Sequence, residues 1–188
     1  MRLTKPRFAP LSDAELTPEQ AEALEPMRPG PVLNIFRTLA HAPKALTRFN
    51  AWGGYVLSRR NDLPAREREI VILRIGYLCR SGYEWTQHVV IGKRSGLSDD
   101  EIARIKAGPD AAGWSAPDKA LMAASDELHR DQFITDQTWT DLRSHFSEKQ
   151  AMDVVFTAAQ YTQVSMFLNT FGVQLDAGQT LDPDLKGF

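Results

Sequence analysis

The stretch EIVILRIGYLCRSGYEWTQH, residues 69–88, decides how this chain folds. Residues 70–79 are apolar on nearly every side of a helix, a pattern typical of a helix surrounded by others. Ser81 and Gly82 interrupt this pattern, and a second helix is predicted over residues 83–94. We therefore expect the helix that ends near Cys79 to be the central one.

The remainder of the chain also shows helical periodicity. Thr17, Ser98 and Ser147 each begin a capping box, in which a Ser or Thr is followed three residues later by Glu or Gln. No segment alternates polar and apolar residues for long enough to predict a strand. The chain is predicted to be all-α, a bundle of eight or nine helices. The first of these helices is expected to begin at residue 17. The others are expected to cover residues 32–40, 43–60, 65–79, 83–94, 98–106, 115–130, 135–146 and 147–174.

The domain organisation is predicted to be simple. Residues 1–16 have no helical period and are expected to form an extended arm. Residues 17–175 are expected to form one all-α domain, because 188 residues suit a single core. Residues 176–188 contain Pro and Gly and are predicted to be a tail.

Composition excludes several classes of protein. The formal net charge is −2 and the basic residues are scattered, so we expect no nucleic-acid partner. Residues 151–171 are mostly apolar but are interrupted by Asp153, Gln160, Gln163 and Asn169, which favours a core helix over a membrane span. The first ten residues lack the apolar segment of a signal peptide, and a cytoplasmic location is expected.

The sequence also supports no cofactor or metal. A single cysteine, Cys79, can form neither an intramolecular disulfide nor a C-x-x-C pair. His41, His129 and His145 are isolated along the chain, and neither a zinc motif nor a glycine-rich phosphate loop occurs.

Glu84 and His88 are the strongest candidates for chemistry, since residues four apart share one face of a helix. Each also has a structural interpretation. Glu84 fits a capping box with Ser81, and His88 fits a histidine at the edge of the core. Glu69 fits a solvated acid in the first turn of its helix.

Arg74 lies inside the apolar helix and must therefore have a partner, for which Glu69 or Glu84 are the candidates. Arg74, Tyr83 and Trp85 are the candidate substrate-binding residues.

The segments RE-IVILR, YEWTQHV and GLSDDEI resemble the carboxymuconolactone decarboxylase and alkylhydroperoxidase D-like family. The peroxidase branch of this family has the pattern E-x11-C-x2-C-x3-H. Glu69 and His88 match its Glu and His, whereas Ser81 and Glu84 occupy the two cysteine positions. Thiol peroxidase activity needs both an attacking and a resolving thiol, so the resemblance points to the decarboxylase-type branch.

This resemblance implies a cofactor-free lyase that removes CO2 from a small carboxylated lactone in the degradation of aromatic compounds. His88 would donate the proton, Glu84 would set its charge, and Glu69 would hold or relay the proton. The resemblance also implies an alkylhydroperoxidase D-like helical bundle that assembles into a homotrimer or homohexamer. Three alternatives remain open: a related hydratase or isomerase, a non-catalytic oligomeric protein, and a one-cysteine peroxidase that uses Cys79.

Overall fold

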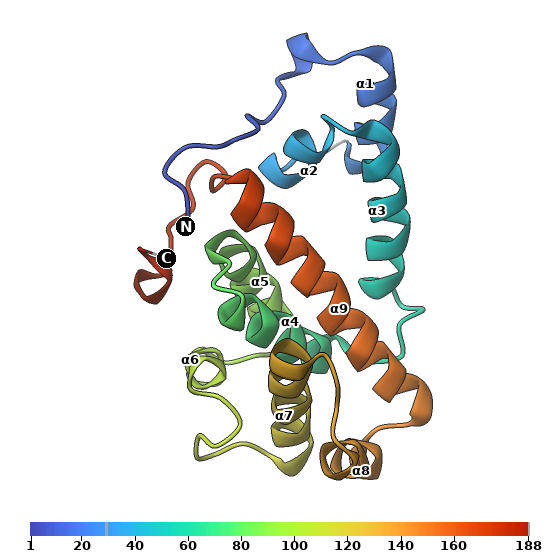
Figure 1. Cartoon of the computed structure of the whole chain (residues 1–188), viewed down its shortest axis with the longest axis vertical. Helices are drawn as coiled ribbons and strands as arrows, with labels where there is room; N and C mark the ends of the chain where they lie inside the picture. Colours follow the sequence, from blue (N-terminus) through green and yellow to red (C-terminus); the bar gives the residue numbers. More distant parts are fainter. Residues whose placement is uncertain (29, 188) are drawn as a thin grey trace.

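The computed structural model describes residues 1–28 and 30–187, which contain nine α-helices and no strand (Figure 1). The predicted all-α fold is confirmed. Pro29 and Phe188, which belong to the predicted domain and tail, lie outside the described residues. The helices are α1 (Pro18–Leu24), α2 (Asn34–Leu39), α3 (Pro43–Val56), α4 (Ala65–Leu78), α5 (Gly82–Arg94), α6 (Asp99–Ala107), α7 (Ala116–Asp131), α8 (Asp136–His145) and α9 (Glu148–Phe171), with short 3-10 turns at Asp13–Glu15, Glu25–Met27 and Pro183–Leu185.

Helix starts follow the local sequence closely. The side chains of Thr17, Ser98 and Ser147 each accept a hydrogen bond from the backbone N–H three residues later, and all three predicted capping boxes form. Ser81 differs, because it precedes α5 without a side-chain capping bond. The predicted capping box between Ser81 and Glu84 is therefore wrong.

Helix α4 is the centre of the fold, as its apolar pattern predicts. Every residue of α4 from position 69 to 76 is buried, and the helix contacts α5, α6, α7 and α9. Its Ile70, Ile72, Leu73 and Ile75 side chains are fully buried in the largest apolar cluster of the molecule. This cluster draws most of its members from α4, α7 and α9.

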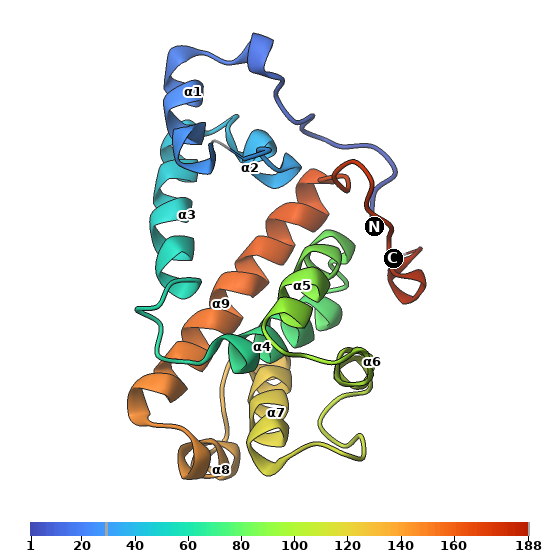
Figure 2. The same cartoon turned by 180° about the vertical axis from the view of Figure 1, so that it is seen from behind.

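A smaller layer, formed by α1, α2 and α3, lies on the other side of α9 (Figures 1 and 2). Its own core is a cluster of four buried residues, Ala23, Leu24, Ala40 and Leu46. Helix α9 passes between this layer and the α4–α8 body, and it contacts α3 on one side and α4, α5, α7 and α8 on the other. The candidate site lies where these two parts meet.

The C-terminal segment returns along α5 after α9 ends at Gly172. Gly172 has φ 71°, a left-handed conformation that suits glycine at the end of a helix. Asp176 then accepts hydrogen bonds from the Tyr83 hydroxyl at 2.6 Å and from Gln87 Nε2 at 2.7 Å. The N-terminal amine of Met1 donates to the Leu185 carbonyl at 2.7 Å, so the two ends of the chain lie together.

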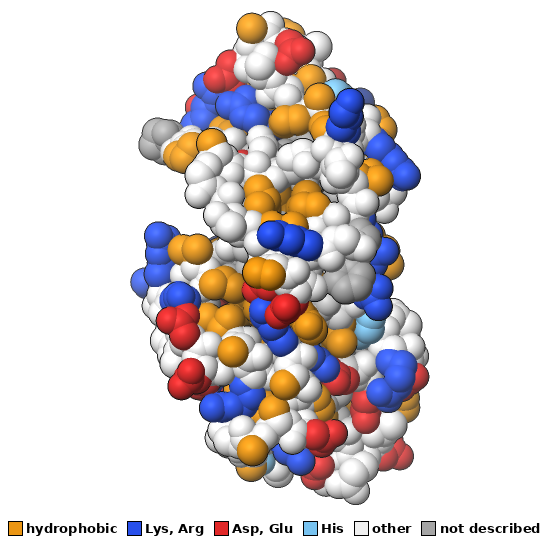
Figure 3. Space-filling model, turned by 90° about the vertical axis from the view of Figure 1, so that its left-hand side faces the viewer, with side chains coloured by type: hydrophobic (Ala, Val, Ile, Leu, Met, Phe, Trp, Pro, Cys, Tyr) orange, Lys and Arg blue, Asp and Glu red, His pale blue; other side chains and the backbone are white. Residues whose placement is uncertain are grey.

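Figure 3 views the side of the molecule on which both termini lie. Lys and Arg side chains are interspersed there with Asp and Glu, and neither sign forms a continuous patch. Among the described residues, no helix combines the length and apolarity needed to cross a membrane.

Candidate active site

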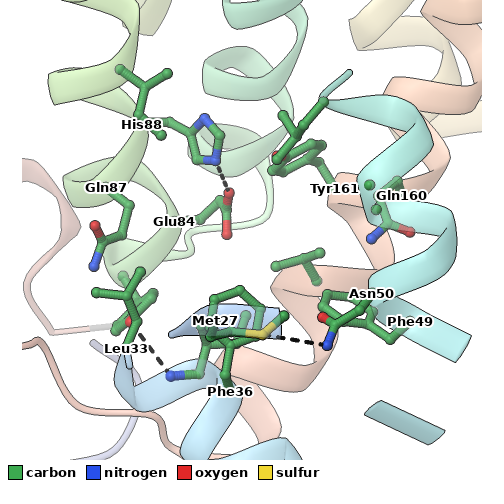
Figure 4. Close-up of a pocket in the computed structure, with 17 residues that line it drawn as sticks. Met27, Leu33, Phe36, Phe49, Asn50, Glu84, Gln87, His88, Gln160 and Tyr161 are labelled. Carbon is green, nitrogen blue, oxygen red and sulfur yellow. Dashed lines mark hydrogen bonds and ion pairs between the residues drawn. The ribbon is translucent and has the colours of Figure 1, made fainter. Parts of the chain in front are cut away.

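Three predicted residues meet at one buried point. Glu69 comes from α4, and Glu84 and His88 come from α5. His88 Nδ1 lies 2.7 Å from Glu69 Oε2, and His88 Nε2 lies 3.0 Å from Glu84 Oε1 (Figure 4). The three residues are only 1%, 4% and 6% exposed, in the order Glu69, Glu84, His88. We call this arrangement the Glu–His–Glu trio.

The two carboxylates keep His88 protonated. Burial alone lowers the pKa of His88, but the charges of Glu84 and Glu69 and their contacts to the ring outweigh it and raise the pKa to about 10. Each carboxylate can accept one N–H, and only the imidazolium has two N–H groups to donate. His88 is therefore a positively charged proton donor at neutral pH.

The structure removes the structural interpretations of the two acids. Glu69 is not a solvated acid in the first turn, because it is buried and paired with His88. Glu84 is not a helix cap, because its carboxylate faces Nε2 of His88. A buried acid without a partner would be costly, so each carboxylate requires the histidine.

Glu84 and His88 line a cavity of about 310 Å³ between the α2–α3 layer and helices α5 and α9 (Figure 4). Glu69 does not line it and lies behind His88, in α4. The cavity wall is mostly apolar, as is usual for small-molecule sites. Its apolar members are Met27, Leu33, Ile35, Phe36, Phe49, Leu57, Ile91 and Val164.

Two lining residues of α9, Tyr161 and Gln160, were not among the predicted site residues. The Tyr161 ring stands edge-on to the His88 ring, with centroids 4.9 Å apart. Burial and the charges of Glu84 and Glu69 hold the pKa of Tyr161 well above its ordinary value, so its hydroxyl remains a donor. Gln160 Oε1 is buried without a hydrogen-bond partner among the described residues. The only sequence feature that could have indicated these two residues is that Gln160 is a polar residue within an apolar helix.

Arg74 lies elsewhere, and its predicted partners are wrong. Its guanidinium forms a two-point ion pair with Asp126 of α7, with contacts of 2.5 and 2.8 Å, and donates to the Ile105 and Lys106 carbonyls. Arg74 does not line the cavity, contrary to its prediction as a substrate-binding residue. Asp126 is 52 positions away in sequence, so no local pattern indicates this pair.

The two aromatic candidates are separated. Tyr83 lines the cavity, while its hydroxyl donates to Asp176. Trp85, on the other side of α5, donates its indole N–H to Asp182 at 3.0 Å and does not line the cavity. Residues two positions apart lie on nearly opposite sides of a helix, so Tyr83 and Trp85 face different surroundings.

Within the described residues, no group of three or more His, Cys, Asp or Glu side chains is arranged to hold a metal ion.

Residues 43–127 match the family model of the carboxymuconolactone decarboxylase family. The resemblance to this family is confirmed over that segment. The match runs from α3 into α7 and includes the whole Glu–His–Glu trio, but Gln160 and Tyr161 lie beyond it. No functionally curated protein has a sequence that matches this chain.

Several solved structures share the fold. A peroxidase-related protein from Silicibacter sp. TM1040 has a TM-score of 0.78 at 16% identity, covering 93% of this chain and 96% of that chain. An alkylhydroperoxidase AhpD core protein from Ralstonia eutropha JMP134 has a TM-score of 0.77 at 18% identity, covering 90% and 93%. The debrominase Bmp8, in complex with 2,3,4-tribromopyrrole, has a TM-score of 0.76 at 12% identity, covering 93% and 94%. At these identities the likeness establishes the fold alone.

Proposed function

We propose that this chain is a cofactor-free acid–base lyase of the carboxymuconolactone decarboxylase type, which removes CO2 from a small carboxylated lactone of aromatic-compound degradation. The observation that carries the proposal is the Glu–His–Glu trio, which presents Glu84 and a protonated His88 to an apolar cavity. A cavity of about 310 Å³ suits a small ring compound.

The chemistry needs a proton donor and a site for negative charge. When CO2 leaves, the electron pair of the broken C–C bond moves through the ring to the lactone carbonyl, giving a dienolate. His88 supplies the proton that carbon then takes up, Glu84 accepts it from Nε2 and passes it on at the cavity, and Glu69 holds the ring from behind.

The dienolate oxygen also needs hydrogen-bond donors. Tyr161 and Gln160 offer the hydroxyl and amide groups of the same wall. Donors fixed in an apolar cavity stabilise developing charge more strongly than water does.

One observation favours a second candidate. None of the described residues that line the cavity is Lys or Arg, and the Glu–His–Glu trio carries a formal charge of −1. An anionic substrate would therefore enter without a free cation to bind it, which is costly in an apolar site. The same residues suit an isomerase that moves a proton within a neutral lactone, or a hydratase that adds water to its double bond.

The test follows both reactions in D2O by NMR, with pairs of butenolides that differ only in a γ-carboxyl group. Release of CO2 from the carboxylated member supports the decarboxylase. Deuterium uptake or double-bond migration in the neutral member supports the isomerase. If neither member of any pair reacts, the proposed function is wrong.

Variants then test the residues. Glu84→Gln and His88→Ala should lower turnover by about 10² to 10⁴. Glu69→Gln should lower it less, because Glu69 acts through His88. Glu22→Gln, on an exposed position of α1, is the matched control and should leave turnover unchanged. Near wild-type turnover in all three site variants would refute the assignment.

We also propose that the chain works in the cytoplasm as a homotrimer or homohexamer. Large apolar side chains on the surface support self-association, among them Phe133 at 61% and Met166 at 60% exposure. Sedimentation velocity distinguishes a trimer or hexamer from a monomer.

A further inference from the structure

A second cavity lies at the opposite end of α4 from its polar first turn. Its volume is about 570 Å³. It is lined by the end of α4, by His129 and Gln132 at the end of α7, by one face of α9, and by Arg2 and Arg7 of the N-terminal arm. None of its lining residues belongs to the Glu–His–Glu trio.

The cavity contains a thiol paired with an imidazole. Cys79 Sγ lies 3.6 Å from His129 Nδ1. His129, which is isolated in the sequence, thus has a reactive neighbour 50 positions away. Cys79 is partly exposed, so the thiol is not sealed in the core.

A second polar side chain of the cavity, Ser165, lies beside the thiol. Ser165 lines the cavity, is 1% exposed, and has no hydrogen-bond partner for its hydroxyl among the described residues. A hydroxyl buried in this way is stabilised when a ligand or a neighbouring anion accepts a hydrogen bond from it. A thiolate at Cys79 is such an acceptor, since Ser165 favours the ionised thiol.

The surroundings of Cys79 keep its thiol protonated, so a base is needed to remove the proton. Burial raises the pKa of Cys79, and Glu84 raises it further, while Ser165, Arg2 and Thr162 lower it. Cys79 also ends α4, where the helix dipole disfavours an anion. The thiol is therefore protonated at rest, and its proton must be removed as it reacts.

His129 can remove that proton. Burial lowers the pKa of His129, although Asp126 acts in the opposite direction and Arg74 in the same one. The imidazole is thus neutral at pH 7 and able to accept a proton. Arg2 and Arg7 at the rim supply positive charge that attracts an anion.

We propose that Cys79 and His129 form a second reactive site, at which the thiol undergoes exchange with a small anionic disulfide. Cys79 Sγ attacks one sulfur of the disulfide, forming a new S–S bond as the old one breaks. His129 Nδ1 takes the thiol proton, and the departing thiolate carries away the electron pair and is then protonated. Cys79 is oxidised to a mixed disulfide, and the released half of the reagent is reduced to a thiol.

The experiment compares two disulfide probes on the native chain at pH 7 and low salt. The anionic probe is 5,5′-dithiobis(2-nitrobenzoate), and the uncharged probe is 4,4′-dithiodipyridine. Because the chain has one cysteine, each rate reports Cys79 alone. Intact mass should show one adduct, which Cys79→Ser abolishes.

His129→Gln should slow both probes by about 100-fold, the usual loss of a general base. Arg2→Gln should slow only the anionic probe, by about tenfold. Lys5→Gln is the matched control, because Lys5 is an exposed cation of the same arm that does not line the cavity. It should change neither rate.

Wild-type rates in His129→Gln, or equal effects of Arg2→Gln and Lys5→Gln, would overturn the proposal. A further test uses the wild-type chain alone, because a variant could lose activity simply by failing to fold. Native wild-type protein should react with the anionic probe faster than the same chain unfolded in urea, and a slower native reaction also overturns it.

Discussion

At the scale of single residues, His88 makes the stability of the fold depend on pH. Its pKa is raised from 6.5 to about 10, by Glu84 and Glu69 against the opposing effect of burial. The folded chain therefore keeps a proton that the unfolded chain releases above pH 6.5. This contribution is complete below pH 6.5 and is lost as the pH rises through 10.

We expect the free energy of unfolding to fall by on the order of 3 kcal/mol between pH 6.5 and 9 from this group. In Glu84→Gln one of the two charges is gone and the pKa of His88 is lower, so the fall should be less than half as large. Urea unfolding at pH 6 and pH 9 measures both. Glu22→Gln, at an exposed position, should behave as the wild type does. A wild type with no more pH dependence than Glu84→Gln would contradict the charged state of His88.

The same scale shows how far the sequence could predict the site. Glu84 and His88 are one helical turn apart, so their pairing follows from spacing alone. The burial of Glu69 does not follow from spacing. In the sequence it resembles a solvent-exposed Glu of a polar first turn, and only the packing of α5 on α4 buries it. The partner of Arg74 is likewise a tertiary contact, since Asp126 belongs to α7.

At the scale of elements, α5 packs closely on α4 through glycine. A Cβ added to Gly92 would lie 3.1 Å from Leu97 Cδ1 and 3.3 Å from Leu73 Cδ1. Both leucines are buried, at 3% and 0% exposure, so neither has room to move away. Glycine is required here by the close approach of the two helices.

Gly92→Ala should therefore destabilise the fold by about 1 to 2 kcal/mol, the usual cost of overpacking. Gly54→Ala is the matched control in α3, because a Cβ there meets nothing within 4 Å. Alanine is favoured over glycine inside a helix, so this variant should gain about 0.5 to 1 kcal/mol. Thermal unfolding of the two variants measures the difference, and equal melting temperatures would show that α4 and α5 are less closely packed.

Elements were also the most predictable level. Helix starts at Thr17, Ser98 and Ser147 followed from capping residues, because a cap is a bond within four residues. Ser81 resembled the same motif, yet Glu84 forms an ion pair with His88 instead. The capping box predicted from Ser81 and Glu84 does not form, because Glu84 pairs with the buried His88.

At the scale of the whole molecule, the two parts of the fold have unequal cores. The α4–α8 body and α9 hold most of the large apolar cluster, whereas α1, α2 and α3 share a core of four buried residues. Less buried apolar surface means a lower free energy of local opening. Because the cavity lies between these parts, movement of the α1–α3 layer would change the width of its opening.

Hydrogen exchange should therefore be faster in α1, α2 and α3 than in α4 and α7. Leu46→Ala, in the small core, should reduce protection in the α1–α3 layer while α4 and α7 keep theirs. Leu121→Ala, in the large core, is the matched control. Its cavity should cost about 2 to 5 kcal/mol and reduce protection throughout the chain. If Leu46→Ala instead exposes α4 and α7 as much as the α1–α3 layer, the molecule opens as one unit, and the α1–α3 layer does not open on its own.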